Sequence, residues 1–139
     1  MSNMVWALVT ARSRAPALFK TVAVEATSRI FEFNPQNLAN TAWAFATAHE
    51  TSPDLFDAVA AAALNRLEHF SCQGVANLAW AFACAGQSNP SLYRELGRLA
   101  ARRVKDFDER GHVQLYQVVL FITVEHPDVD FEPIDPKYA

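Results

Sequence analysis

Arginine recurs along the chain at a constant spacing. Arg29, Arg66 and Arg103 lie 37 residues apart, and three further arginines follow one another at i, i+4 spacing before the last of them: Arg94, Arg98 and Arg102. A guanidinium presents a planar fork of donors that matches phosphate, so one arginine per repeat could follow a phosphate backbone. Arginine near the C-terminal end of a helix also interacts with the helix dipole and needs no ligand there. We predict phosphate contacts for Arg29, Arg66, Arg98, Arg102 and Arg103, with the structural role as the alternative.

Side-chain amides form a second column with the same spacing: Asn3, Asn40, Asn77 and Gln114. In repeat proteins such amides can hydrogen-bond the edges of unstacked bases. A buried amide must also find partners within the fold, so each amide could instead bond a backbone group of the neighbouring repeat. A residue that reads sequence should vary between repeats, so the constant column favours the structural role. The variable positions nearby are the better candidate base readers: Asn37, Thr47 and Thr10.

Catalysis and metal binding find no support in the sequence. The four histidines have no Ser, Cys or carboxylate partner at a motif spacing, and no glycine-rich phosphate loop is present. Cys72 and Cys84 match no metal-ligand pattern, and Cys84 lies in an apolar helical pattern where a thiol acts as a small hydrophobic group. We therefore predict a protein that is not an enzyme and that uses neither a metal nor a cofactor.

A repeat of 37 residues carries these polar columns. Nine positions are identical in three successive copies, and they include all three tryptophans, Trp6, Trp43 and Trp80. The segment ANTAWAFATA at 39–48 returns as ANLAWAFACA at 76–85, and a fourth copy is degenerate, with Gln117 in the tryptophan column. A period between about 20 and 50 residues is typical of solenoids and repeat arrays.

Each copy contains two helix starts. Preferred N-cap residues open a first helix at Asn34, Ser71 and Asp108, and a cap followed by proline opens a second helix at Ser52 and Asn89. Gly86 follows an apolar run and can end its helix in the left-handed conformation. The repeat is therefore predicted to be a helical hairpin.

The apolar positions form a stripe on each helix that is wider than one hairpin can bury, and we expect the tryptophans to lie inside. At least three hairpins must stack to cover it. We predict an all-α fold, an α-solenoid of tandem 37-residue helical hairpins of the armadillo or HEAT type. It spans residues 1–125 as three hairpins and a degenerate fourth helix. An acidic, proline-containing tail follows at 126–139.

The charge of the chain is uneven. Residues 1–107 carry ten basic and eight acidic side chains, and residues 108–139 carry two and seven, so the formal net charge of −3 arises from the C-terminal part. The repeats are less basic than the surface of a typical nucleic-acid binder. No apolar run is long enough for a membrane span, so we predict no membrane contact. Residues 1–24 have the composition of an organellar transit peptide, but their column matches indicate repeat structure, so no targeting signal is evident.

One family resemblance rests on these residues. A block of about 37 residues that reads NLAWAFA at 77–83, continues with a proline-led second helix and ends with a phenylalanine before the next cap resembles the helical repeats of octotricopeptide proteins. It is also similar to the related FAST-kinase-like, RAP-domain and RNA-editing substrate-binding complex proteins. The resemblance implies an α-solenoid that binds single-stranded RNA in an organelle. It also implies that the chain is part of a longer repeat protein.

Two functions are compatible with these observations. In the first, which the resemblance implies, the chain binds RNA and acts in organellar RNA processing, stability or translation, in the mitochondrial matrix or alternatively in the chloroplast. Its partners would be single-stranded RNA and proteins of an organellar ribonucleoprotein complex. In the second, which the charge balance favours, the same groove is a scaffold that holds a segment of another protein without nucleic acid.

Overall fold

The 37-residue repeat of the sequence appears in the structure as a repeated order of elements. The computed structural model describes residues 16–49, 52–87 and 89–125. Within these ranges it contains six α-helices, three short 3₁₀ helices and no strand, which confirms the predicted all-helical class. The elements are α2 (Pro16–Ser28), η1 (Ile30–Glu32), α3 (Pro35–Thr47), α4 (Pro53–Leu64), η2 (Leu67–His69), α5 (Cys72–Cys84), α6 (Pro90–Arg102), η3 (Val104–Asp106) and α7 (Glu109–Glu125). The predictions for Asn3, Trp6, Thr10 and the tail from residue 126 lie outside the described residues.

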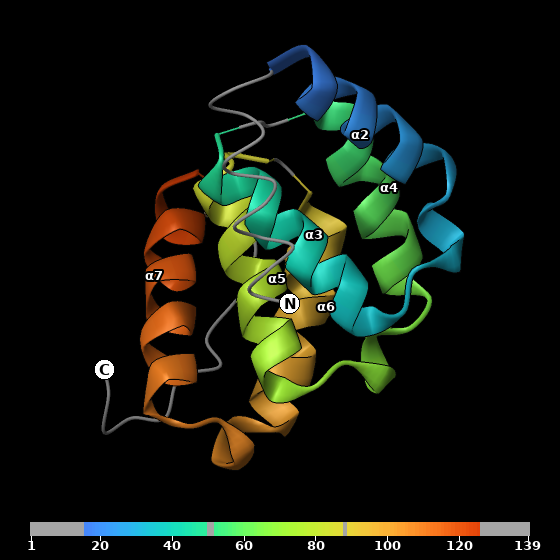
Figure 1. Ribbon diagram of the computed structural model, residues 1–139. Helices are drawn as coiled ribbons and strands as arrows, with labels where there is room; N and C mark the ends of the chain where they lie inside the picture. Colours follow the sequence, from blue (N-terminus) through green and yellow to red (C-terminus); the bar gives the residue numbers. More distant parts are fainter. Residues whose placement is uncertain (1–15, 50–51, 88, 126–139) are drawn as a thin grey trace.

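The helices form two layers. Helices α3, α5 and α7 lie side by side, and α5 packs against both of its neighbours (Figure 1). The second layer contains α2, α4 and α6, with α4 in contact with both α2 and α6. Helices α3 and α5 of the first layer are each followed along the chain by a helix of the second layer, so α3 with α4, and α5 with α6, form hairpins.

Polar side chains begin the helices where the sequence predicted. Asn34 Oδ1 accepts a hydrogen bond from the Asn37 amide at 2.7 Å, and Asn37 Oδ1 accepts one from the Asn34 amide at 3.3 Å, which makes a capping box. The other four predicted caps each accept one amide of the first turn: Ser52 from Leu55 at 3.4 Å, Ser71 from Gly74 at 3.0 Å, Asn89 from Leu92 at 3.1 Å and Asp108 from Gly111 at 2.8 Å. The predicted helix starts are therefore confirmed.

Gly86 ends α5 in the left-handed conformation, as the sequence predicted. Its φ is +68°, and an added Cβ would meet no atom within 4 Å, so only backbone strain opposes a side chain there. We expect Gly86→Ala to lower the free energy of unfolding by about 1 kcal/mol, measured by urea denaturation. A variant as stable as the wild-type protein would contradict the left-handed assignment.

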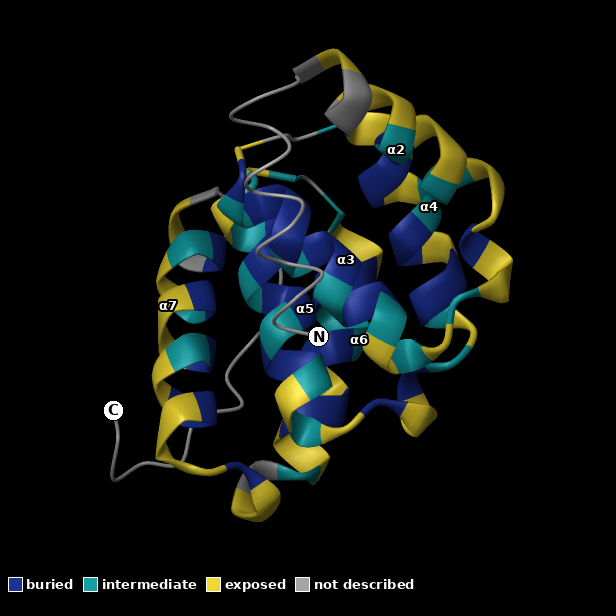
Figure 2. Cartoon of the chain, viewed as in Figure 1, coloured by how far each residue is buried: buried dark blue, intermediate teal, exposed yellow. Residues whose placement is uncertain are grey.

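The core lies between the two layers, where the facing sides of the helices are buried (Figure 2). Alanines occupy much of the buried surface of α3 and α5, which lets these helices approach closely. Large side chains fill the space toward α4 and α6, and the Phe56 and Phe82 rings meet edge to face with centroids 5.1 Å apart. Phe70 and Phe107, which precede the caps of α5 and α7, are buried.

Two burial predictions were wrong. Trp43 and Trp80 are only partly buried, because their column lies at the edge of the apolar stripe, on the side of the first layer that faces away from α4 and α6. Cys84, in the last turn of α5, is exposed rather than packed in the core. The indoles are therefore available at the surface and contribute less to stability than buried rings would.

Candidate functional site

A groove runs over the first helical layer, across α3, α5 and α7. It has a volume of about 880 Å³ and is lined by polar and aromatic side chains that include Asn40, Trp43, Asn77, Gln114 and Gln117. A smaller hollow of about 560 Å³ lies one repeat earlier, between α3 and α5, and shares Asn40, Gln73 and Asn77 with the groove. Most of its lining residues correspond to groove residues 37 positions later, so the same concave site occurs twice along the stack.

The described part of the amide column, Asn40, Asn77 and Gln114, lines this groove, and we call it the amide ladder. Gln114 Nε2 donates a hydrogen bond to Asn77 Oδ1 at 3.0 Å, across the contact between α5 and α7. The partner is thus a side chain of the next helix and not the backbone group expected from the sequence. One repeat earlier, Asn40 Nδ2 is buried and makes no hydrogen bond within the described part of the chain. The Asn40 side chain lines the groove, but its Nδ2 atom is covered by surrounding atoms.

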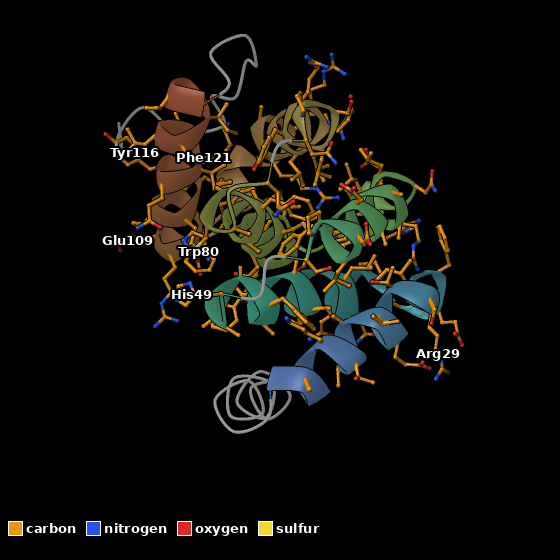
Figure 3. All side chains as sticks on the ribbon, turned by 90° about the horizontal axis from the view of Figure 1, so that it is seen from above. Arg29, His49, Trp80, Glu109, Tyr116 and Phe121 are labelled. Carbon is orange, nitrogen blue, oxygen red and sulfur yellow. The ribbon has the colours of Figure 1, made fainter. Side chains whose placement is uncertain are left out.

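The tryptophan column lies beside the ladder. The Trp43 and Trp80 rings are 6.0 Å apart between centroids, at 31° to each other. Trp80 lies at the junction of α5 and α7 (Figure 3), where its Nε1 donates a hydrogen bond to Gln117 Oε1 at 3.1 Å. Partly exposed indole faces of this kind can stack with unpaired bases.

The constant arginines close the hairpins. Arg66, just after α4, donates from Nη2 to the Phe33 carbonyl, just before α3, at 2.5 Å. Arg103 repeats this contact one hairpin later, from Nη1 to the Phe70 carbonyl at 2.5 Å and from Nη2 to the Glu68 carbonyl at 2.8 Å. Each arginine thus joins the end of the second helix of its hairpin to the start of the first. We call these contacts the arginine clasps.

The other predicted phosphate-binding arginines are paired with carboxylates. Arg29 Nε lies 2.9 Å from Glu32 Oε2, and this contact raises the pKa of Arg29 and lowers the pKa of Glu32. Arg98 pairs with Glu95 at 2.6 Å, and Arg102 pairs with Glu68. Arg66 and Arg102 line a separate hollow of about 260 Å³ beside α4 and α6. None of the predicted arginines is among the residues that line the groove.

The family model of the RNA-editing substrate-binding complex 6 protein matches residues 1–130. The chain belongs to this family. The match supports the RNA-editing substrate-binding complex proteins among the resembled families, and it does not support the octotricopeptide, FAST-kinase-like or RAP-domain types. No significant match was found among curated proteins or among solved structures.

The structure brings together only some of the site residues predicted for this family member. Asn40 and Asn77 lie in the groove. Asn37 is used in the capping box of α3, and Thr47 Oγ1 is buried without a hydrogen bond among the described residues. Neither Asn37 nor Thr47 lines the groove or the hollow beside it, so their role as base readers stays a prediction.

The acidic end of the groove was not predicted from the sequence. Asp106, Asp108 and Glu109 line it at the start of α7, together with Arg110, and all four side chains are exposed. The sequence does contain a cluster of acidic residues around the predicted cap Asp108. The position of these residues relative to the amide ladder, however, depends on the packing of α7 on α5. The result is a groove with more negative than positive charge at one end.

Cys72 also lines the groove, but its thiol is not activated as a nucleophile. Burial raises the pKa of Cys72, although the Arg103 guanidinium nearby acts in the opposite direction. A thiol of raised pKa is a poor nucleophile at neutral pH. Within the described ranges, no group of His, Cys, Asp and Glu residues could hold a metal ion, and no helix is long and apolar enough to cross a membrane.

Proposed function

We propose that the protein is an RNA-binding helical-repeat subunit of a mitochondrial RNA-editing substrate-binding complex. The family match supports membership of such a complex. We take the hairpins of the chain as successive units of an α-solenoid. Its partners would be single-stranded RNA and other proteins of the complex. A chloroplast ribonucleoprotein is the alternative setting.

The observation that carries the RNA proposal is the combination of exposed indole faces and side-chain amides in one groove. Trp43 supplies a surface for stacking, and the side-chain amides of Asn40 and Asn77 line the groove next to it. Stacking tolerates any base, and an amide beside it can bond a base edge. We therefore propose that bases enter the groove.

The charges near the groove determine how the proposed RNA binding should depend on salt. The arginine clasps and the carboxylate pairs occupy the guanidiniums that the sequence offered for phosphate. With few free cations in contact with phosphate, the affinity should fall only slightly as salt is raised. This differs from the steep salt dependence expected of a basic RNA-binding surface.

We expect Trp43→Ala to weaken the binding of a fluorescently labelled single-stranded RNA by about 5- to 150-fold, measured by fluorescence anisotropy. The estimate follows from about 1 to 3 kcal/mol for each stacked base. Phe31→Ala is the matched control, because Phe31 is a 72% exposed aromatic residue on η1, away from the groove, and it should leave the affinity unchanged.

Loss of RNA binding in an Arg98→Ala, Arg102→Ala variant, with Trp43→Ala unaffected, would move the RNA site to the arginines beside α6.

The acidic end of the groove favours a second function, a scaffold that holds a basic segment of another protein. A folded wild-type protein that binds no single-stranded RNA, and that recovers a protein partner dependent on Asp106 and Glu109, would replace the RNA proposal with this one.

A further inference from the structure

Helix α7 carries an apolar stripe that the described part of the chain leaves uncovered. Val113, Tyr116, Leu120 and Val124 are 51%, 39%, 52% and 75% exposed. Their spacing of three, four and four residues places them on one side of the helix. Tyr116 points away from the other helices, whereas Phe121 points toward them (Figure 3) and contacts Tyr93 of α6.

The same face is buried in the earlier repeats. The residues equivalent to Val113, Tyr116 and Leu120 are Ala39, Ala42 and Ala46 in α3 and Ala76, Ala79 and Ala83 in α5. All three alanines of α3 and the first two of α5 are at most 2% exposed within the stack, in which α3 packs on α5 and α5 on α7. The α7 stripe therefore continues an established interface.

The apolar composition of the α7 stripe differs from the polar outer face of a capping repeat at the end of a repeat array. A terminal repeat normally has a polar outer face, because nothing packs against it. Helix α7 instead replaces alanines with larger apolar side chains, and at 17 residues it is longer than the 13-residue α3 and α5. Val124, the most exposed of the four, lies on the additional turn. Larger side chains set a wider spacing between helix axes than alanine does.

We propose that this stripe is an interface with a second copy of the chain, in which the two α7 helices pack antiparallel about a two-fold axis. The axis would cross α7 at the level of Val118 and Val119 along the helix. It would place Val113 opposite the partner's Val124 and Tyr116 beside the partner's Leu120. A two-fold interface uses one patch twice, so a single apolar stripe is sufficient to form it.

Arg110 favours the antiparallel direction. Glu109 and Arg110 are exposed at its N-terminal end, and no Asp, Glu, Lys or Arg occurs from residue 111 to 124. An antiparallel pair brings Arg110 near the C-terminal end of the partner's α7, where the helix dipole is negative. A parallel pair would instead bring each Arg110 near the partner's Arg110.

Sedimentation equilibrium of the whole chain tests the proposal without RNA. One pair of helices is small beside stable interfaces of about 1,000 Å² or more, so we expect a reversible shift from monomer to dimer as concentration rises. Leu120→Glu should raise the dimer dissociation constant at least about tenfold, and Val124→Glu should act in the same direction. Val24→Glu, on the 70% exposed Val24 of α2, is the matched control and should have no effect.

A protein that stays monomeric at every concentration would overturn the proposal, as would a dimer that neither α7 variant weakens. Val124 is so exposed that Val124→Glu should fold normally, which circular dichroism can verify. The direction is tested by mixing Val113→Cys and Val124→Cys proteins in a Cys72→Ser, Cys84→Ser background. Disulfides between the two variants are expected, and disulfides formed mainly between copies of the Val113→Cys protein would overturn the antiparallel pairing.

Discussion

Phe82→Ala should lower the free energy of unfolding by about 3 to 5 kcal/mol. Phe82 is 1% exposed in α5, and its ring meets Phe56 of α4 edge to face. Alanine would remove most of the side chain from a site enclosed by both helical layers, and the rigid helices could close only part of the cavity. Urea denaturation followed by circular dichroism measures the effect.

Phe31→Ala is again the control, because a largely exposed ring should change stability by less than about 0.5 kcal/mol. A double-mutant cycle with Phe56→Ala should show coupling of about 0.5 to 1.5 kcal/mol from the ring pair. If Phe82→Ala changed the stability by no more than Phe31→Ala does, the two-layer core described above would be wrong.

Arg103→Met should lower the free energy of unfolding by about 2 to 3 kcal/mol. The guanidinium is 24% exposed and donates to the carbonyls of Phe70 and Glu68, which lie before α5. Methionine keeps most of the apolar length of the side chain but leaves these carbonyls without their charged donor. Arg66→Met should act in the same way through Phe33, because it opens the clasp of the preceding hairpin.

The adjacent Arg102 is the matched control. Its side chain is 60% exposed and pairs with an exposed carboxylate of Glu68, so Arg102→Met should cost less than about 1 kcal/mol. Stability measurements on Arg103→Met and Arg102→Met also separate the two roles considered for the arginine column. If Arg103→Met kept full stability and lost RNA affinity, the clasp would be wrong and phosphate binding would be right.

The helices and their ends were determined by local sequence. The caps at Asn34, Ser71 and Asp108 and the left-handed Gly86 were predictable because each depends on residues within one turn of helix. The 37-residue spacing also predicted that equivalent helices would lie next to one another, because a repeated apolar stripe can be buried only by its neighbours.

The groove depended on contacts between residues far apart in the chain. Gln114 bonds Asn77 from 37 residues away, and Trp80 bonds Gln117 at the same separation, so their pairing follows from the packing of α7 on α5. The tryptophans were expected to be buried because they belong to the apolar stripe, but the edge of the stripe that the second layer leaves uncovered depends on tertiary packing.

The contacts of the arginines and the exposure of α7 were decided by tertiary structure. A constant spacing of arginine is compatible with phosphate binding and with a structural contact, and only the fold brings Arg66 and Arg103 to carbonyls 33 residues earlier. In the same way, the sequence by itself determined that α7 is a degenerate copy of α3 and α5. The apolar stripe of α7 is exposed because no described helix packs on the side of α7 opposite α5. Whether a side chain is buried depends on which elements pack against it in the fold, and local sequence does not determine that.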